Sequence, residues 1–434
     1  MAQGAEQGAD LRLVVEPNQS ASRALSIDTL RGFIVLTMIF VDDLGLASTH
    51  VVPAWMRHYE GPGGMYFADV VLPAFLFIVG MSVPFALQAR IDKSEPRWRT
   101  LLHIGERTAS LLLLGVIIVN GLADSEKMGW SAKLWSVLTR LSAILAFSAI
   151  KVPRRWKESQ THSRVISRLS TGLRVVGLSA LVMLALAFRG RDGHRIVSLS
   201  PFSVHTEWWG ILGQIGWAYL TASVVYLVVG SRRPALLVTT ALLYGLYVAD
   251  KKGLVGFLGL SRYLEVGEML GSQSAIAVLG VVLSTSVWRK NTIASVAQSA
   301  RFALLLVVVC ALAALAFQGA YGVSKDDATP SWALWSSSIM VALWLLFYLR
   351  SDARAGDAQA SRIVTALSIA GQNVLLAYLL RDFIASLLPF LHFEGVYQTF
   401  ASGLAAALVR SLAWAIAIVL ASNGLNRLGF HVKL

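Results

Sequence analysis

The segment 26–80 holds ionisable residues whose types and spacing could support chemistry. It reads SIDTLRGFIVLTMIFVDD, then a loop with WMRHYEGPGGM, then YFADVVLPAFLFIVG, so charges stand among two very apolar stretches. A histidine with an ordinary pKa of about 6.5 can act as a general base at neutral pH, and a carboxylate on its other ring nitrogen would fix its tautomer. His58 is therefore a candidate base. Its candidate carboxylate partners are Asp42, Asp43 and Asp69, and the sequence leaves open which of them is within reach.

The first apolar stretch carries charges near both of its ends. On an ideal helix, Arg31 and Asp42 are separated by about 20° of rotation and about 16 Å of rise, so they share one stripe. Asp28 stands three residues before Arg31, where it can neutralise or hold the guanidinium. This helix is predicted to present a cation near one membrane face and carboxylates near the other.

The composition identifies an integral membrane protein. Of the 434 residues, 56% are hydrophobic and 15% are charged, which is too little charge to cover a soluble globule of this size. The net charge of +13 comes from short basic runs between apolar stretches, which indicates membrane topology and no nucleic-acid partner. The single cysteine, Cys310, has no partner for a disulfide, and the histidine spacings match no zinc motif, so we expect no metal.

Apolar stretches of sufficient length predict an all-α transmembrane bundle. The twelve candidate spans lie near residues 27–44, 67–89, 101–121, 133–150, 173–188, 210–230, 234–250, 270–287, 301–320, 331–349, 363–387 and 404–421. The eleventh is expected to be interrupted by Arg381 and Asp382, so a range of ten to twelve spans stays open. With the N-terminus inside, 23 Lys and Arg fall in inside segments and 10 in outside loops, which predicts cytoplasmic termini.

Five further cations fall within the predicted spans: Arg31, Arg107, Arg140, Arg381 and Arg410. Charges in the membrane are costly, so each is a candidate for function, and a structural ion pair is the alternative.

The chain is predicted to have one folded domain. Residues 1–25 are polar and lack the order of a signal peptide, so we expect a disordered cytoplasmic tail followed by a transmembrane domain over 26–434. The topology places His58 in an outer loop. Four other histidines are interpreted as isolated residues near span boundaries: His103, His194, His205 and His392.

A series of motifs follows the order of the predicted spans. They are RALSIDTLRGF, MIFVDD, the loop histidine, VVLPAFLFIVGMS, VLTRLSAI, WWGILGQIGWAYL, GSQSAIAVLGVVL, WALWSSSIMVAL and IAGQNVLLAYLL. In this order they resemble the transmembrane acyltransferases related to heparan-α-glucosaminide N-acetyltransferase. The resemblance covers nearly all the spans.

The resemblance implies a reaction. Such proteins transfer an acetyl group from cytosolic acetyl-CoA to an amine or hydroxyl of a sugar-type acceptor across the membrane. His58 matches the family's catalytic histidine, which acts as a general base or as a transient acyl carrier. Asp42, Asp43 and Asp69 would assist it, and Arg31 at the inner end could bind the phosphates of CoA.

A set of residues is predicted to contact the acetyl-CoA co-substrate. Five of them match motifs of the family, and the other three, Asp28, Arg31 and Arg381, are charges within apolar spans. Hydrogen bonding between helices is the alternative role for each of them. The set comprises Asp28, Arg31, Arg140, Gln273, Ser274, Gln372, Asn373 and Arg381.

Two departures from the family pattern bear on the mechanism. Asp42 stands where the family has asparagine, and an ionised carboxylate cannot donate a hydrogen bond to a thioester carbonyl. The step from His58 to Asp69 is also longer than in better-known members. No large domain precedes the first span, so we expect a bacterial-type member in a cytoplasmic membrane, acting on something other than a lysosomal polysaccharide.

Other readings stay open. Twelve spans with carboxylates near one face are also typical of a proton-coupled secondary transporter or flippase of a small solute or glycoconjugate. A scaffold subunit of an envelope pathway is a third reading. The sequence does not decide between a monomer and a homodimer.

Overall fold

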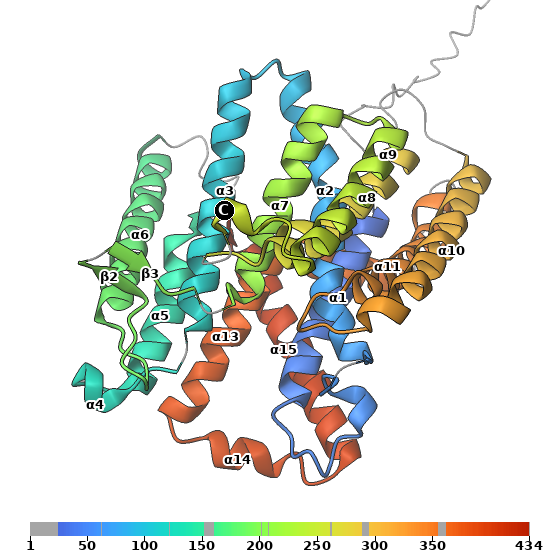
Figure 1. The fold of residues 1–434 in the computed structure, drawn as a ribbon. Helices are drawn as coiled ribbons and strands as arrows, with labels where there is room; N and C mark the ends of the chain where they lie inside the picture. The colour runs from blue at the N-terminus through green and yellow to red at the C-terminus, as the bar shows by residue number, and fades with distance from the viewer. Residues whose placement is uncertain are drawn as a thin grey trace, which may run out of the picture.

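The computed structural model describes residues 25–61, 63–120, 122–151, 160–200, 202–206, 208–260, 263–288, 295–354 and 362–433. It is mainly a bundle of helices (Figure 1). The predicted disordered tail lies outside the described residues, except for Leu25, which begins the first helix.

The helices and short strands follow one another along the chain. The first part contains α1 (Leu25–Leu44), η1 (Ala54–Met56), η2 (Phe67–Val70), α2 (Val71–Asp92), α3 (Arg97–Val119), α4 (Ser125–Met128), α5 (Ala132–Ala146), β1 (Ser148–Ile150) and α6 (Gln160–Ala187). The middle part contains β2 (Val197–Leu199), β3 (Phe202–Val204), α7 (Gly210–Val229), α8 (Arg233–Lys251), η4 (Gly256–Leu258), η6 (Val266–Gln273) and α9 (Ser274–Val287). The last part contains α10 (Val296–Tyr321), α11 (Pro330–Arg350), η7 (Asp352–Arg354), α12 (Arg362–Ala370), α13 (Val374–Phe390), α14 (Glu394–Thr399), α15 (Leu404–Arg427) and β4 (Phe430–Val432). Strand β1 pairs antiparallel with β4, and β2 pairs antiparallel with β3.

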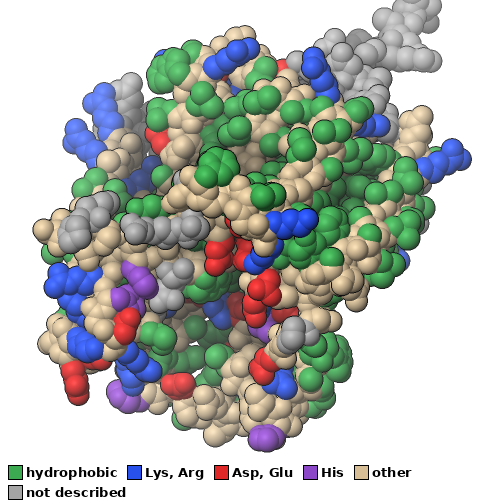
Figure 2. Space-filling model, viewed as in Figure 1, with side chains coloured by type: hydrophobic (Ala, Val, Ile, Leu, Met, Phe, Trp, Pro, Cys, Tyr) green, Lys and Arg blue, Asp and Glu red, His purple; other side chains and the backbone are tan. Residues whose placement is uncertain are grey.

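The protein is a helical integral membrane protein. Among the described residues, eight helices are long and apolar enough to cross a membrane, or nine if the bent pair α12 and α13 forms one span. Helix α10 exposes a row of leucines and valines, as a lipid-facing helix does, and Figure 2 shows apolar side chains covering much of the upper part of one face. The twelve-span topology with cytoplasmic termini stays a prediction.

The eleventh predicted span is broken, but at a different place from the one expected. Helices α12 and α13 meet at an angle of 72° across residues 371–373. Arg381 and Asp382 lie inside α13, where charged side chains leave the backbone hydrogen bonds of a helix intact. The break coincides with tight packing on α1, because a Cβ atom on Gly371 would lie 2.2 Å from the carbonyl oxygen of Asp28.

Helix α9 lies at the centre of the bundle. In the span formed by η6 and α9, 94% of the most apolar 18-residue stretch is buried inside the protein. Helix α2 contacts it backbone to backbone, since a Cβ atom on Gly80 would lie 1.8 Å from the carbonyl oxygen of Ala277. Small residues permit such close approach between membrane helices.

A buried ion pair joins the end of α1 to α15. The carboxylate of Asp43 accepts hydrogen bonds from Arg410 Nε at 3.1 Å and from Ser411 Oγ at 2.7 Å. The hydroxyl of Tyr397, on α14, donates to the same carboxylate at 2.5 Å. The side chains of Arg410 and Asp43 are 6% and 2% exposed, so neither charge can be satisfied by water. Asp43 therefore fixes three elements relative to one another.

Replacing Asp43 should destabilise the protein strongly. The variant Asp43→Asn leaves the buried Arg410 charge uncompensated, a change that costs about 3–5 kcal/mol. Asp42→Asn is the matched control, because Asp42 is 24% exposed and its partner Arg381 also pairs with Asp382. Thermal unfolding of the purified protein, followed by circular dichroism, should show the larger fall in Tm for Asp43→Asn. Equal falls would contradict a structural role specific to Asp43.

Candidate functional site

His58 forms a pair with Asp69 beside the start of α2. The ring nitrogen Nδ1 of His58 lies 2.8 Å from Asp69 Oδ1. The Asp69 side chain is 1% exposed, whereas the His58 side chain is 51% exposed. Asp69 is thus the carboxylate within reach of the histidine. The contact uses Nδ1, so the other ring nitrogen, Nε2, is left for a substrate.

The remaining contacts of Asp69 hold it rigidly. Its Oδ2 atom accepts hydrogen bonds from the backbone N–H groups of Tyr59 at 3.0 Å and Tyr66 at 2.9 Å. These bonds bring together the two ends of the segment 59–66, which directly follows His58. The backbone carbonyl of Asp69 accepts a hydrogen bond from Trp332 Nε1, on α11, at 3.2 Å. A carboxylate fixed in this way can orient the imidazole and hold the proton on Nδ1.

A second cluster of charges surrounds Asp42. Arg381 NH2, from α13, lies 3.4 Å from Asp42 Oδ2, and Arg381 NH1 lies 2.5 Å from Asp382 Oδ1. Arg140, on α5, interacts electrostatically with Asp382 and Arg381, and Asp42 interacts with His58. The structure therefore groups the predicted residues Arg140 and Arg381 with Asp42, at the end of α1 opposite Arg31.

Arg31 is engaged by protein groups. Its NH1 atom lies 2.9 Å from Asp28 Oδ1, and its NH2 atom donates to Ser82 Oγ, on α2, at 2.8 Å. The break that contains Gln372 and Asn373 packs beside Asp28 through Gly371. The residues predicted to bind acetyl-CoA thus lie in two groups, one near each end of α1.

Several of the predicted polar residues have different surroundings. Asn373 is buried and its Nδ2 atom has no hydrogen-bond partner among the described residues, whereas Gln372 is exposed. Gln273 is buried with its Oε1 atom likewise unsatisfied. Ser274 Oγ donates to the carbonyl of Met269 at 2.7 Å, which stabilises the π-helical turn at the start of this span. The unsatisfied amide atoms of Asn373 and Gln273 are thus enclosed by protein.

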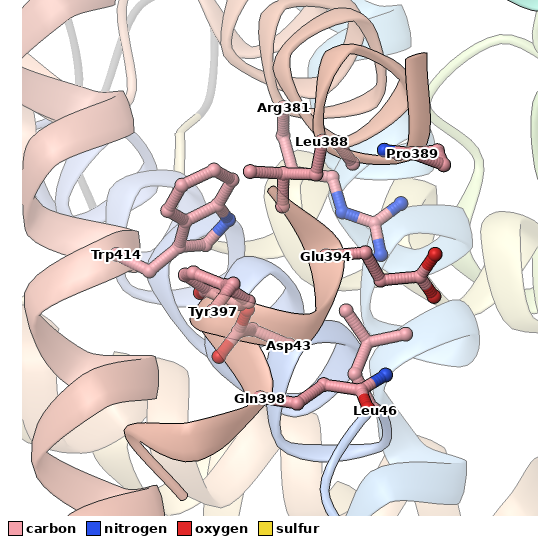
Figure 3. A pocket seen from close by; sticks show the side chains of 10 residues that line it. Asp43, Leu46, Arg381, Leu388, Pro389, Glu394, Tyr397, Gln398 and Trp414 are labelled. Atoms are coloured by element: carbon pink, nitrogen blue, oxygen red, sulfur yellow. The ribbon is translucent and has the colours of Figure 1, made fainter. Parts of the chain in front are cut away.

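A pocket opens beside Arg381 and Asp43. The rings of Tyr397 and Trp414 stand on one side of it, and the carboxylate of Glu394 reaches in from α14 toward the Arg381 guanidinium (Figure 3). Glu394 forms no ion pair or hydrogen bond with the described residues. Sequence reasoning missed these residues because α14 is a six-residue helix inside a predicted loop. The run EGVYQ, with a carboxylate three residues before a tyrosine, is the signal that could have drawn attention to it.

The interpretation of His194 and His205 as isolated residues was wrong. Their rings lie 4.3 Å apart between centroids, and His194 Nε2 lies 3.2 Å from Asn120 Oδ1. A hydrogen bond from His194 lowers the pKa of Asp192. These residues meet because the strands β2 and β3 form a hairpin, and a bridge joins Ala123 to Gly190. Such contacts between loops leave no periodic pattern in the sequence.

Comparisons with known proteins match part of the chain. A family model described as a domain of unknown function (DUF5009) matches residues 23–192. The heparan-alpha-glucosaminide N-acetyltransferase of Homo sapiens is 30% identical over 120 residues, which are 27% of this chain and 17% of the relative. The protein of the same name from Mus musculus is 29% identical over 139 residues, which are 32% of this chain and 20% of the relative.

The matched segments thus span a fifth or less of the length of these relatives. The DUF5009 match includes His58, Asp69 and Arg140, and leaves out α13 to α15. Over the part of the chain that they cover, these two relatives confirm the predicted resemblance to the heparan-α-glucosaminide N-acetyltransferases.

Proposed function

We propose that this protein is a membrane-embedded acyltransferase that moves an acetyl group from acetyl-CoA to an amine or hydroxyl of a sugar-type acceptor. The observation that carries the proposal is the pair of His58 and Asp69. A buried, rigidly held carboxylate on one ring nitrogen and a half-exposed ring are what a general base needs. The distant relatives named as N-acetyltransferases support the reaction class.

In the proposed step, His58 and Asp69 act together on one proton. Asp69 keeps the proton of the ring on Nδ1, so Nε2 carries the lone pair. Nε2 removes the proton from the acceptor N–H or O–H as the acceptor atom bonds to the thioester carbonyl carbon. The C–S bond then breaks, and the proton passes from Nε2 to the leaving CoA sulfur. Donor and acceptor are thereby converted to acetylated acceptor and free CoA.

The three predicted carboxylates receive different roles. Asp43 is committed to Arg410, Tyr397 and Ser411, so we assign it to structure. Asp42 is paired with Arg381, so it influences His58 only through its charge. Asp69 alone among them contacts His58.

The phosphates of the donor are proposed to bind on the cytoplasmic side, near Arg31, with His58 on the outer face of a bacterial cytoplasmic membrane. Because Arg31 already contacts Asp28 and Ser82, a phosphate there would have to share or replace these partners. This makes Arg31 a weaker candidate for donor binding than its charge alone suggests.

We assign the acceptor to the pocket beside Arg381. Aromatic rings such as Trp414 stack on the apolar faces of sugars, and the Glu394 carboxylate can bind hydroxyl or ammonium groups. Four carboxylates near the pocket outnumber three arginines, which favours an uncharged or cationic sugar over an anionic one. The carboxylates are Asp42, Asp43, Asp382 and Glu394, and the arginines are Arg140, Arg381 and Arg410.

Changes to the histidine pair test the reaction. His58→Ala should abolish transfer of radiolabelled acetyl from acetyl-CoA, and Asp69→Asn should lower kcat by about 10²–10⁴, the usual contribution of acid–base catalysis. His50→Ala, an exposed histidine in the same loop, is the control and should keep full activity. Sugar uptake by proteoliposomes without acyl-CoA would instead favour the transporter reading. Transfer that survives in His58→Ala would contradict the mechanism.

A change at Glu394 tests the acceptor pocket. Glu394→Gln removes a charge-assisted hydrogen bond of about 1.5 kcal/mol, so the KM for an amino sugar should rise roughly tenfold. The KM for acetyl-CoA serves as the internal reference. Glu126→Gln removes an equally exposed carboxylate on α4, outside the pocket, and should leave both constants unchanged. An unchanged acceptor KM in Glu394→Gln would exclude this pocket as the acceptor site.

A further inference from the structure

Acyl transfer from a thioester places negative charge on the carbonyl oxygen in the transition state. Enzymes stabilise this charge with fixed donors or cations, often as their largest catalytic contribution. Asp42 cannot serve while it is ionised, because a carboxylate only accepts hydrogen bonds. Arg381 is held by Asp42 and Asp382, and among the described residues it makes no contact with His58 or Asp69. Another group beside His58 is therefore needed.

Lys325 lies beside the histidine pair. Its Nζ atom is 3.7 Å from Asp69 Oδ1, the same oxygen that contacts His58 Nδ1 at 2.8 Å. The ammonium group and the imidazole thus share one carboxylate oxygen, which holds both on the same side of Asp69. The Lys325 side chain is 29% exposed, so it is accessible to a substrate that reaches His58.

The donors of Lys325 are not consumed by its carboxylate neighbours. Asp326 Oδ1 lies 3.6 Å from Nζ, and Asp69 Oδ1 lies at a similar distance. Both separations are those of ion pairs and exceed the usual hydrogen-bonding range. An ammonium carries three N–H donors, so Lys325 can direct a donor toward a ligand while its charge stays balanced.

The loop that carries Lys325 is held in place. Within it, the N–H of Ser324 donates to Thr329 Oγ1 at 3.0 Å. Tyr247, on α8, donates to the carbonyl of Asp327 at 3.2 Å. Trp332, just beyond the loop, donates to the carbonyl of Asp69, so the loop and the carboxylate are fixed to each other. Preorganised charge of this kind is what stabilises a transition state without a reorganisation cost.

We infer that Lys325 is a further catalytic residue, whose ammonium group donates a hydrogen bond to the thioester carbonyl oxygen as its negative charge develops. This role rests on the proposed acyltransferase function. Lys325 keeps its proton throughout: the oxyanion forms as the acceptor atom bonds to the carbonyl carbon, and it collapses when the C–S bond breaks. His58 alone carries the transferred proton.

A double-mutant cycle tests this role. Lys325→Met should lower kcat for acetyl transfer by about 10²-fold, the usual cost of removing one oxyanion donor, with little change in the KM for acetyl-CoA. A further loss of kcat should also appear when Lys325→Met is made in an Asp69→Asn background, because the two groups act on different atoms. This second loss should be smaller than the first, since groups 3.7 Å apart are energetically coupled. Lys252→Met, an exposed lysine on another loop, is the matched control and should behave as the unaltered protein.

The outcomes separate the alternatives. If Lys325 acted only by positioning Asp69, its loss would have no further effect in the Asp69→Asn background, and our inference would be overturned. Lys325→Arg keeps the charge and should retain most of kcat, which distinguishes catalysis from a folding defect. The carbonyl stretch of bound ¹³C-acetyl-CoA should move to higher frequency in Lys325→Met. Unaltered protein that neither binds nor uses acetyl-CoA would refute the proposed function, whereas full activity in Lys325→Met would refute the role of Lys325 alone.

Discussion

The central constraint on this fold is that a charge buried in an apolar bundle must have a partner. Asp43 forms an ion pair with Arg410, and Asp42 forms one with Arg381. These pairs connect α1 to α15 and to α13, elements that stand more than 300 residues away in the sequence. The charges of the first helix therefore determine where the last helices pack.

The same constraint explains why Asp69 differs from the other carboxylates. Its side chain is almost completely buried, yet its ring partner is half exposed. Backbone donors from Tyr59 and Tyr66 satisfy Oδ2, and the partly exposed Lys325 lies 3.7 Å from Oδ1, so Asp69 keeps its place without a fully buried cation. His58 can therefore exchange contacts with solvent or substrate while its supporting carboxylate stays fixed. That combination of rigidity and access is expected of a catalytic pair and not of a structural one.

Much of this could be predicted from the sequence, and the rest could not for physical reasons. Helical spans follow from apolar length, so α2 and α10 were expected close to where they occur. The choice of Asp69 among three carboxylates depends on how the loop folds back on η2, which no periodicity encodes. The break at residues 371–373 arises from packing of Gly371 on α1, so it could not be read from the charges at Arg381 and Asp382. Lys325 and Glu394 could not be linked to the site from the sequence, because each lies between predicted spans and far along the chain from His58.

The consecutive residues Asp42 and Asp43 have different surroundings although they lie on the same helix. Adjacent side chains on a helix point about 100° apart, so one faces α15 while its neighbour faces α13. Asp43 is bound by Arg410, Tyr397 and Ser411, and of these three partners Tyr397 also lines the pocket near Trp414. Asp42 instead holds Arg381 at the pocket wall and acts on His58 through its charge. An asparagine at position 42 would leave Arg381 to Asp382 alone and release positive charge toward the pocket. The aspartate is thus matched to Arg381, and in the mechanism that we propose the hydrogen bond to the carbonyl oxygen comes from Lys325 and not from α1.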